Sequence, residues 1–285
     1  MNKKIPTYEE LVSPLTPWSI SWLKWGLARS FLNTLGRLSE GIRIGFKSGF
    51  DSGQMLDYVY KNQPQGNFLI GKLIDGFYLN SPGWTGIRQR KVHLKAILKD
   101  IITERKRNGQ KTVIMDLASG PGQYLIEIIQ ENQDADLEVI CRDLSDGGLT
   151  EGRKKVQGLN LKRIKYEKAD AFSLQELQNA TPRPNVIVVS GLYELFTDNN
   201  VIRQSMQNIS SLLQKGDHFI FTNQPYHPQL EMIARVLPNR LGEPWVMRVR
   251  SDEQVKQWSQ EASFEFKKTL IDQWGIFSVT CTRRK

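Results

Sequence analysis

Acidic residues and glycines in this sequence are spaced as a nucleotide-binding site requires. Asp116 closes an apolar run, Val113–Met115, that is typical of a β-strand. Gly120 and Gly122 follow in a short turn, and the apolar spacing of residues 124–130 then predicts a helix. Glycine lets the backbone approach a ligand closely, and the first N–H groups of a helix face electron-rich ligands. Strand, glycine turn and helix together predict the first unit of a nucleotide-binding βαβ fold.

The spacing of the glycines narrows the choice of ligand. A dinucleotide fingerprint that starts at Gly120 would need a third glycine at the position of Leu125, and the Lys-Ser/Thr pair of a phosphate-binding loop does not follow the turn. An acid that closes the strand and a Gly-Pro-Gly turn remain. This pattern resembles the first motif of class I methyltransferases, whose cofactor is S-adenosyl-L-methionine (SAM). The alternative is any βαβ unit that contains a glycine turn.

The resemblance implies a role for the whole turn. Its residues are expected to approach the amino-acid part of SAM, and Asp116 is expected to order the turn or to reach the SAM ammonium group. The candidate residues of the turn are Ala118, Ser119, Gly120, Pro121 and Gly122.

Asp143 is the candidate for binding the ribose. It closes the next predicted strand, Leu137–Arg142, and lies 21 residues beyond Gly122. An acid about 20 residues after the glycine turn binds ribose hydroxyls in such folds. The alternative is a cap for the helix expected after Leu144. Residues 143–149 also resemble the segment that follows this strand in class I methyltransferases, which adds Leu144 to the cofactor candidates.

Two further strands supply the remaining candidates. A short strand from Ile164 ends at Asp170, and in class I methyltransferases the matching acid faces the adenine amino group; the resemblance therefore assigns Asp170 and Ala171 to adenine, with a helix cap as the alternative. The apolar run 185–190 predicts a buried parallel strand that ends at Ser190, a further cofactor candidate. Residues after this strand face the transferred methyl group in the related enzymes, which makes Tyr193 and Glu194 candidates for the acceptor side.

Tyr226 and His227 are acceptor-side candidates after the fifth predicted strand. Residues 223–228 are similar to the Asn-Pro-Pro-Tyr motif of enzymes that methylate planar nitrogens, but that motif follows the fourth strand and Gln224 replaces its first proline, so we reject this assignment. His227 could remove a proton from an acceptor hydroxyl or amine, because histidine titrates near neutral pH. The alternative is a structural histidine.

The elements that must position these residues predict an α/β fold. Strands over 264–270 and 276–282 have no helix between them and must be antiparallel. That ending is characteristic of the class I methyltransferase sheet. We expect a Rossmann-like, seven-stranded, mostly parallel sheet with its last strand antiparallel, in a domain of residues 86–285 behind a helical cap of residues 1–85.

The cap contains a predicted basic amphipathic helix. Apolar residues three or four apart run from Trp18 to Ile42, and four basic residues lie among them: Lys24, Arg29, Arg37 and Arg43. Tryptophans at the edge of such a helix are typical of peripheral membrane contact, here through residues 18–43; packing on a partner domain is the alternative. The glycine-rich residues 41–53 are expected to be irregular, and further helices are expected over residues 54–60, 68–79 and 84–108.

Charge and cysteine content limit the partners and the compartment. Residues 1–110 carry 17 Lys and Arg against 8 Asp and Glu, whereas residues 111–285 carry 22 of each. An anionic partner near the N-terminal part is therefore expected, while the neutral catalytic half disfavours nucleic acid. The two cysteines lie in apolar runs and indicate reduced core residues rather than a metal site. With no signal peptide and no apolar run of membrane-spanning length, we expect a cytoplasmic protein, peripheral at most to the inner face of the membrane.

A succession of motifs resembles one family more closely. Residues 49–53, 56–60, 87–91, 222–228 and 272–277 are similar, with the glycine turn, to a family of bacterial methyltransferases that are often fused behind an α/β-hydrolase domain. The resemblance covers about residues 40–285 and implies SAM-dependent methyl transfer. Because the chain has no Gly-x-Ser-x-Gly elbow, a hydrolase partner would be a separate chain. Tyr58, Arg88 and Arg90 could close over the cofactor, an arginine pairing with its carboxylate.

The acceptor is left open by these motifs. A lipid or another amphiphilic small molecule would account for the basic helix and its tryptophans, and a soluble metabolite or a protein are alternatives. From a different class, the chain could be a catalytically silent SAM-fold subunit that docks on a hydrolase.

Overall fold

The computed structural model describes residues 5–285, which form two compact units. The helical unit consists of residues 5–89 and 226–249, and the sheet unit consists of residues 90–225 and 250–285. The helical unit therefore combines the N-terminal part of the chain with the segment 226–249. This segment joins the helical unit because the Arg235 guanidinium donates to the Ser13 and Glu10 carbonyls and the Trp25 indole donates to Glu231.

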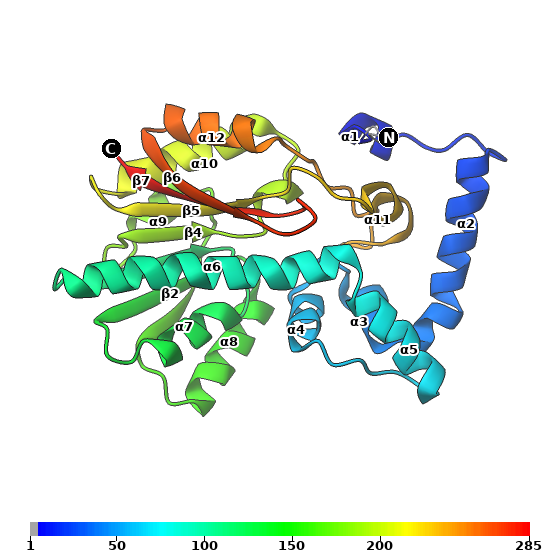
Figure 1. Cartoon of the computed structure of the whole chain (residues 1–285), viewed down its shortest axis with the longest axis horizontal. Coiled ribbons are helices and arrows are strands. Elements are labelled where there is room, and N and C mark those ends of the chain that lie inside the picture. The colour runs from blue at the N-terminus through cyan, green and yellow to red at the C-terminus, as the bar shows by residue number, and fades with distance from the viewer. Residues whose placement is uncertain (1–4) are drawn as a thin grey trace. The chain divides into compact units, whose positions relative to one another are not determined.

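The sheet unit holds one sheet of seven strands in the order β3-β2-β1-β4-β5-β7-β6 (Figure 1). Neighbouring strands are parallel from β3 to β5, and β7 runs antiparallel to both β5 and β6. This arrangement confirms the expected class I methyltransferase fold. The strands are β1 (Thr112–Leu117), β2 (Leu137–Asp143), β3 (Ile164–Lys168), β4 (Val186–Val189), β5 (His218–Asn223), β6 (Phe264–Ile271) and β7 (Ser278–Arg284).

Helices cover both faces of this sheet. One face packs against α6 (Pro82–Arg107), whose residues from 90 onward belong to this unit, α7 (Gln123–Glu131) and α8 (Asp146–Gly158). The other face packs against α9 (Leu174–Gln178), α10 (Asn199–Leu212) and α12 (Asp252–Glu261). Alternate residues of a strand point to opposite faces, so Ile114 joins the first layer and Met115 the second. Asp116 therefore points toward the α7 side.

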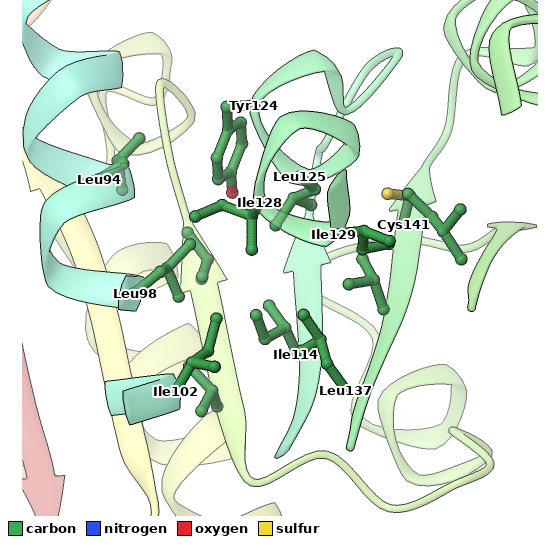
Figure 2. Packing of buried hydrophobic residues seen from close by; sticks show 14 of the residues in the cluster. Leu94, Leu98, Ile102, Ile114, Tyr124, Leu125, Ile128, Ile129, Leu137 and Cys141 are labelled. Carbon is green, nitrogen blue, oxygen red and sulfur yellow. The ribbon is translucent and has the colours of Figure 1, made fainter. Parts of the chain in front are cut away.

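The first layer fixes the position of α7 over β1. Figure 2 shows Leu98 of α6 and Ile128 of α7 pointing toward one another above Ile114, in a cluster that includes fully buried side chains of β2 such as Leu137. Burying an aliphatic side chain of this size contributes about 1.5–3 kcal/mol. The glycine turn is thus held between a rigid strand and a rigid helix.

The helical unit contains shorter helices than the sequence predicted. The continuous helix expected from Trp18 to Ile42 is wrong, because α2 ends at Asn33. Thr34 leaves helical geometry and its hydroxyl donates back to the Ser30 carbonyl, while the Ser39 hydroxyl accepts from the Ile42 N–H and starts a new helix. The elements of this unit are α1 (Tyr8–Val12), α2 (Ile20–Asn33), η1 (Leu35–Leu38), α3 (Glu40–Ser48), α4 (Gly53–Lys61), α5 (Phe68–Leu79) and α11 (Leu230–Val236).

The irregular segment expected over residues 41–53 is also wrong in its first half. Helix α3 continues to Ser48, and its glycines serve close packing. A Cβ at Gly45 would lie 2.3 Å from the Phe50 ring, and one at Gly41 would lie 2.8 Å from the Tyr78 ring. The helices predicted over residues 54–60, 68–79 and 84–108 are confirmed as α4, α5 and α6.

Candidate functional site

Four loops leave the sheet at one edge. Strands β1 to β4 are parallel and adjacent, and Leu117 is in register with Arg142 of β2 and Val189 of β4, while Asp143 is in register with Lys168 of β3. Ligands of open parallel sheets bind at this carboxyl edge. The structure therefore places the candidates that follow β1, β2, β3 and β4 at the same edge of the sheet.

The turn after β1 adopts a conformation that leaves Gly120 open. Ala118, Gly120 and Gly122 have φ values of +61°, +54° and +64°. A Cβ at Gly122 would lie 2.8 Å from the Cys141 sulfur, so this glycine is required by packing on β2. A Cβ at Gly120 would meet no atom within 4 Å in the described part of the chain, its neighbours aside. Gly120 thus exposes backbone where a ligand could approach.

Asp143 holds the turn in place from β2. One of its carboxylate oxygens accepts from the Gly120 N–H at 2.8 Å, and the other accepts from the Ser145 N–H at 2.7 Å. Ser145 is the N-cap residue of helix α8 but its side chain makes no capping hydrogen bond, so the bond that Asp143 accepts from the Ser145 N–H also orders the start of this helix. Each carboxylate oxygen can accept a second hydrogen bond, which leaves capacity for two hydroxyl donors. Leu144 beside it is exposed.

Asp116 is a buried acid of which only one carboxylate oxygen accepts a hydrogen bond from the described residues. Its Oδ2 accepts from the Tyr124 hydroxyl at 2.8 Å, and its Oδ1 has no hydrogen-bond partner among the described residues. Burial raises the pKa of Asp116 to about 8; the Tyr124 hydrogen bond and Arg90 oppose the shift, and Asp143 adds to it. A buried, unpaired acceptor of this kind favours a cationic or donor group beside the turn.

Arg90 and Glu194 form a second incompletely satisfied pair. Arg90 Nη1 lies 3.3 Å from Glu194 Oε1, both side chains are buried, and neither Arg90 Nε nor Glu194 Oε2 has a hydrogen-bond partner in the part of the chain that the structure describes. Burial raises the pKa of Glu194, with Arg90 and Arg250 opposing. A Cβ at Gly191 would lie 3.2 Å from the Arg90 guanidinium, so Gly191 leaves room for this arginine after β4.

The sequence did not distinguish Arg90 from Arg88. Residues two apart on a helix point in different directions, so only one of the two can face the sheet. Arg88 donates instead to the Leu79 carbonyl and the Thr85 hydroxyl, and Tyr58 donates to Asp75, all within the helical unit. The polar groups of Arg88 and Tyr58 are therefore engaged inside that unit.

Asp170 and its neighbours lie after β3. One Asp170 oxygen accepts from the Phe172 N–H at 2.9 Å, and helix α9 is capped by Ser173, so Asp170 is not its cap. The Phe172 ring meets the Phe196 ring edge to face at 4.6 Å between centroids. Ala171 is buried and Ser190 is half-buried at the same edge of the sheet.

One of the acceptor-side predictions, Tyr193, changes with the structure. Tyr193, in η2 (Tyr193–Leu195), is buried in the second core layer and its hydroxyl is 3.0 Å from the Ser205 hydroxyl of α10, so we withdraw it as an acceptor-facing residue. Tyr226 and His227 belong to the helical unit, where His227 Nδ1 accepts from the Gln229 N–H at 3.0 Å. A Cβ at Gly83 would lie 2.8 Å from His227 Nε2, so the ring packs on the first turn of α6.

Comparison with known proteins supplies the family. A family described as "Putative methyltransferase" matches residues 2–284. Among curated proteins, the uncharacterized protein YnbC of Escherichia coli K12 is 39% identical over 274 residues, covering 95% of this chain and 46% of YnbC. The chain thus spans about half the length of this relative.

Solved structures share the fold. A protein of Bordetella parapertussis described as possibly exported matches 95% of this chain and 99% of its own with a TM-score of 0.65 and 13% identity. Magnesium protoporphyrin IX methyltransferase of Synechocystis PCC 6803 with bound SAH covers 91% of this chain and 99% of its own, with a TM-score of 0.54 and 13% identity. The SAM-dependent methyltransferase SibL covers 92% and 74%, with the same TM-score of 0.54 and 13% identity.

Proposed function

We propose that this chain, which belongs to the methyltransferase family that its residues 2–284 match, transfers a methyl group from SAM to a lipid or another amphiphilic small molecule. One arrangement carries the proposal. Gly120 is open at positive φ, and Asp143 holds it at the carboxyl edge of a sheet with the strand order of SAM-dependent methyltransferases. Two proteins that share this fold bear names that include methyltransferase, and one of them was solved with bound SAH.

The charges of the site suit the amino-acid end of SAM. Asp116 Oδ1 is the free acid oxygen beside the turn and would take the ammonium group. Arg90 Nε is a free donor on a cation and would take the carboxylate. Each ligand charge would thus meet a buried group of opposite sign that has no other hydrogen-bond partner for that atom within residues 5–285.

The remaining candidates would hold the nucleoside. Asp143 has acceptor capacity for the two ribose hydroxyls, in addition to its bonds to the turn. Asp170 would accept from the adenine amino group, with Leu144 and Ala171 against the ring. The Phe172 N–H donates to Asp170 and the Phe172 ring packs on Phe196, so this ring pair would lie next to the adenine.

SAM supplies a methyl group that is already strongly electrophilic. The chain therefore has to orient the acceptor in line and keep water out. Glu194 Oε2 can accept a hydrogen bond from an acceptor hydroxyl or amine, because only Oε1 is engaged by Arg90. Tyr226 and His227 stay predictions for the acceptor side.

A catalytically silent subunit that docks on a partner such as a hydrolase is the second candidate. The length of YnbC favours it, since more than half of that relative lies outside the region matched by this chain. Retention of all three acids, Asp116, Asp143 and Asp170, favours the enzyme, because a silent subunit has no need of them.

Calorimetric titration with SAM separates the two candidates. The intact protein is expected to bind SAM saturably, and Asp143→Asn is expected to weaken binding by roughly 10- to 100-fold, since a hydrogen bond to a charged group contributes about 1.5–3 kcal/mol. Asparagine keeps one acceptor oxygen for the turn. The matched control is Asp146→Asn, three residues further on, where the carboxylate is exposed and forms an ion pair with Lys168. No binding by the folded wild-type protein would favour the silent subunit.

A further inference from the structure

The helical unit carries many exposed apolar side chains on α2, η1 and α5, which together we call the α2–α5 surface. Figure 1 labels α2 and α5. Large apolar side chains scattered singly are ordinary on a protein surface, but contiguous stripes mark interaction sites. Leu27 is 72% exposed and Phe77 is 81% exposed, so neither is covered within the described chain.

The stripe on α2 follows helical periodicity. Ile20, Leu23, Leu27 and Phe31 are three or four residues apart and all are exposed. Trp25 faces the opposite way, where it is buried and donates to Glu231 of α11. Packing on α11 therefore accounts for the inner face of α2, but it does not account for the apolar residues on the outer face.

Helix α5 likewise has one exposed apolar face and one buried face. Leu69, Leu73 and Phe77 are four residues apart and exposed, and Ile70 lies beside them. Gly71, Asp75 and Leu79 form the opposite, buried face.

The short helix η1 lies next to both α2 and α5. Both α2 and α5 pack against η1, where a Cβ at Gly71 would lie 2.4 Å from the Leu38 carbonyl oxygen. Leu35 of η1 is itself exposed. The exposed apolar residues thus lie on α2, on η1 and on α5, and η1 packs against both helices.

The charges on this surface have one sign. Lys24, Arg37 and Lys72 are exposed on α2, η1 and α5. The only acid in these three elements is Asp75, which is fully buried. The surface therefore offers apolar side chains and cations together, with no exposed carboxylate.

We propose that the α2–α5 surface docks on the face of an anionic lipid bilayer, with its apolar side chains inserted among the lipid head groups. Interfacial helices combine Trp, Phe and Leu on one face with Lys and Arg beside them, and each basic residue near the membrane adds attraction to anionic lipid. Lysine is depleted in protein–protein interfaces, whereas Lys72 is exposed next to the exposed Leu73 in the sequence and can extend its charge to the head groups. Among residues 5–285 no helix has the length and apolar character to cross a membrane, so contact at the face of the bilayer is the geometry proposed.

Vesicle flotation tests the docking, which does not depend on methyl transfer. The purified chain is mixed with vesicles of phosphatidylglycerol and phosphatidylcholine in equal amounts, and separately with phosphatidylcholine alone. We expect flotation with the anionic vesicles, a clearly smaller fraction with the neutral ones, and weaker binding as salt rises from about 0.1 M to about 1 M, where screening is strong.

Paired substitutions assign the binding to this surface. Leu27→Ser with Phe77→Ser removes one exposed side chain from each stripe and is expected to lower the partition coefficient roughly tenfold or more. The matched control is Leu159→Ser with Leu241→Ser, at side chains that are 48% and 81% exposed outside the three elements. Circular dichroism and thermal melting establish that both variants fold.

Three results would overturn the proposal. The folded wild-type protein could fail to float with anionic vesicles, or the Leu27/Phe77 variant could float as well as the Leu159/Leu241 control. A stable dimer in solution that only the Leu27/Phe77 variant dissociates, without vesicle binding, would assign the surface to a second copy of the chain instead.

Discussion

Asp116 shows how the environment of one side chain prepares the site. The residue is buried between the Tyr124 hydroxyl and the glycine turn, and burial raises its pKa to about 8. In the unfolded chain an aspartate has a pKa of about 3.9. The folded protein therefore holds the Asp116 proton more strongly than the unfolded chain does, and a cationic ligand would favour its release.

The raised pKa of Asp116 predicts a dependence of stability on pH. Its contribution to the free energy of unfolding is fully present below about pH 4 and is lost as pH rises through about 8, because the unfolded chain releases this proton first. Asp116→Asn removes the titration and keeps an oxygen that can accept from Tyr124. The difference in unfolding free energy between wild type and variant, measured by urea titration across this range, should change in favour of the variant as pH rises. A difference that stays constant with pH would contradict the assigned environment.

Much of the candidate site could be identified from residue types and their spacing in the sequence. Asp116, Gly120 and Asp143 could be found because a glycine turn and the acids that end successive strands have fixed positions in the sequence. Roles that depend on the direction in which a side chain points could not be predicted in this way. Tyr193 turned into the core toward Ser205, and Arg90 rather than Arg88 pairs with Glu194, since a short loop or one helix turn decides where each points.

At the scale of elements, two glycines that both lie inside helices have very different surroundings. Gly26 of α2 and Gly45 of α3 both lie inside helices, where glycine is less favourable than alanine. A Cβ at Gly26 would meet nothing within 4 Å, whereas one at Gly45 would lie 2.3 Å from the fully buried Phe50 ring. The two positions should therefore respond in opposite ways to the same substitution.

Gly26→Ala and Gly45→Ala form a matched pair. Gly26→Ala is expected to stabilise the protein by about 0.5–1 kcal/mol through helix propensity. Gly45→Ala gains the same propensity but overpacks against Phe50, and a net loss of about 1–3 kcal/mol is expected. Chemical unfolding measures both values; a Gly45→Ala protein as stable as Gly26→Ala would show that the contact with Phe50 is loose.

Element types were predictable where periodicity was strong and local. The strands of the sheet and helices α4, α5 and α6 follow from apolar runs and spacing. The end of α2 did not follow, because the apolar period continues across residues 34–39 and only the hydroxyls of Thr34 and Ser39 interrupt it. The helix α3 was missed because a run of glycines also fits an irregular segment, unless the aromatic rings that pack on it are known.

At the scale of the whole molecule, the chain passes between the helical unit and the sheet unit three times, after residues 89, 225 and 249. The segment 226–249 leaves the sheet unit after β5 and joins the helical unit through Trp25, Glu231 and Arg235. Such contacts join residues more than two hundred positions apart, and local patterns do not report them. The same unit carries the α2–α5 surface, so a lipid-directed acceptor and a bilayer-docking surface form one consistent account of the chain.

The central claim is that the edge of the sheet at Gly120 binds SAM, and calorimetric titration of two glycine variants tests it most directly. Gly120 and Gly109 both have positive φ and open surroundings, but Gly109 lies in the turn before β1, at the opposite end of that strand. Asparagine tolerates this conformation, so either variant should fold. We predict that wild type and Gly109→Asn bind SAM with affinities within about twofold, and that Gly120→Asn binds at least roughly tenfold more weakly because its side chain occupies the approach to the turn. Equal SAM binding by Gly120→Asn and Gly109→Asn, or none by the folded wild-type protein, would contradict the account.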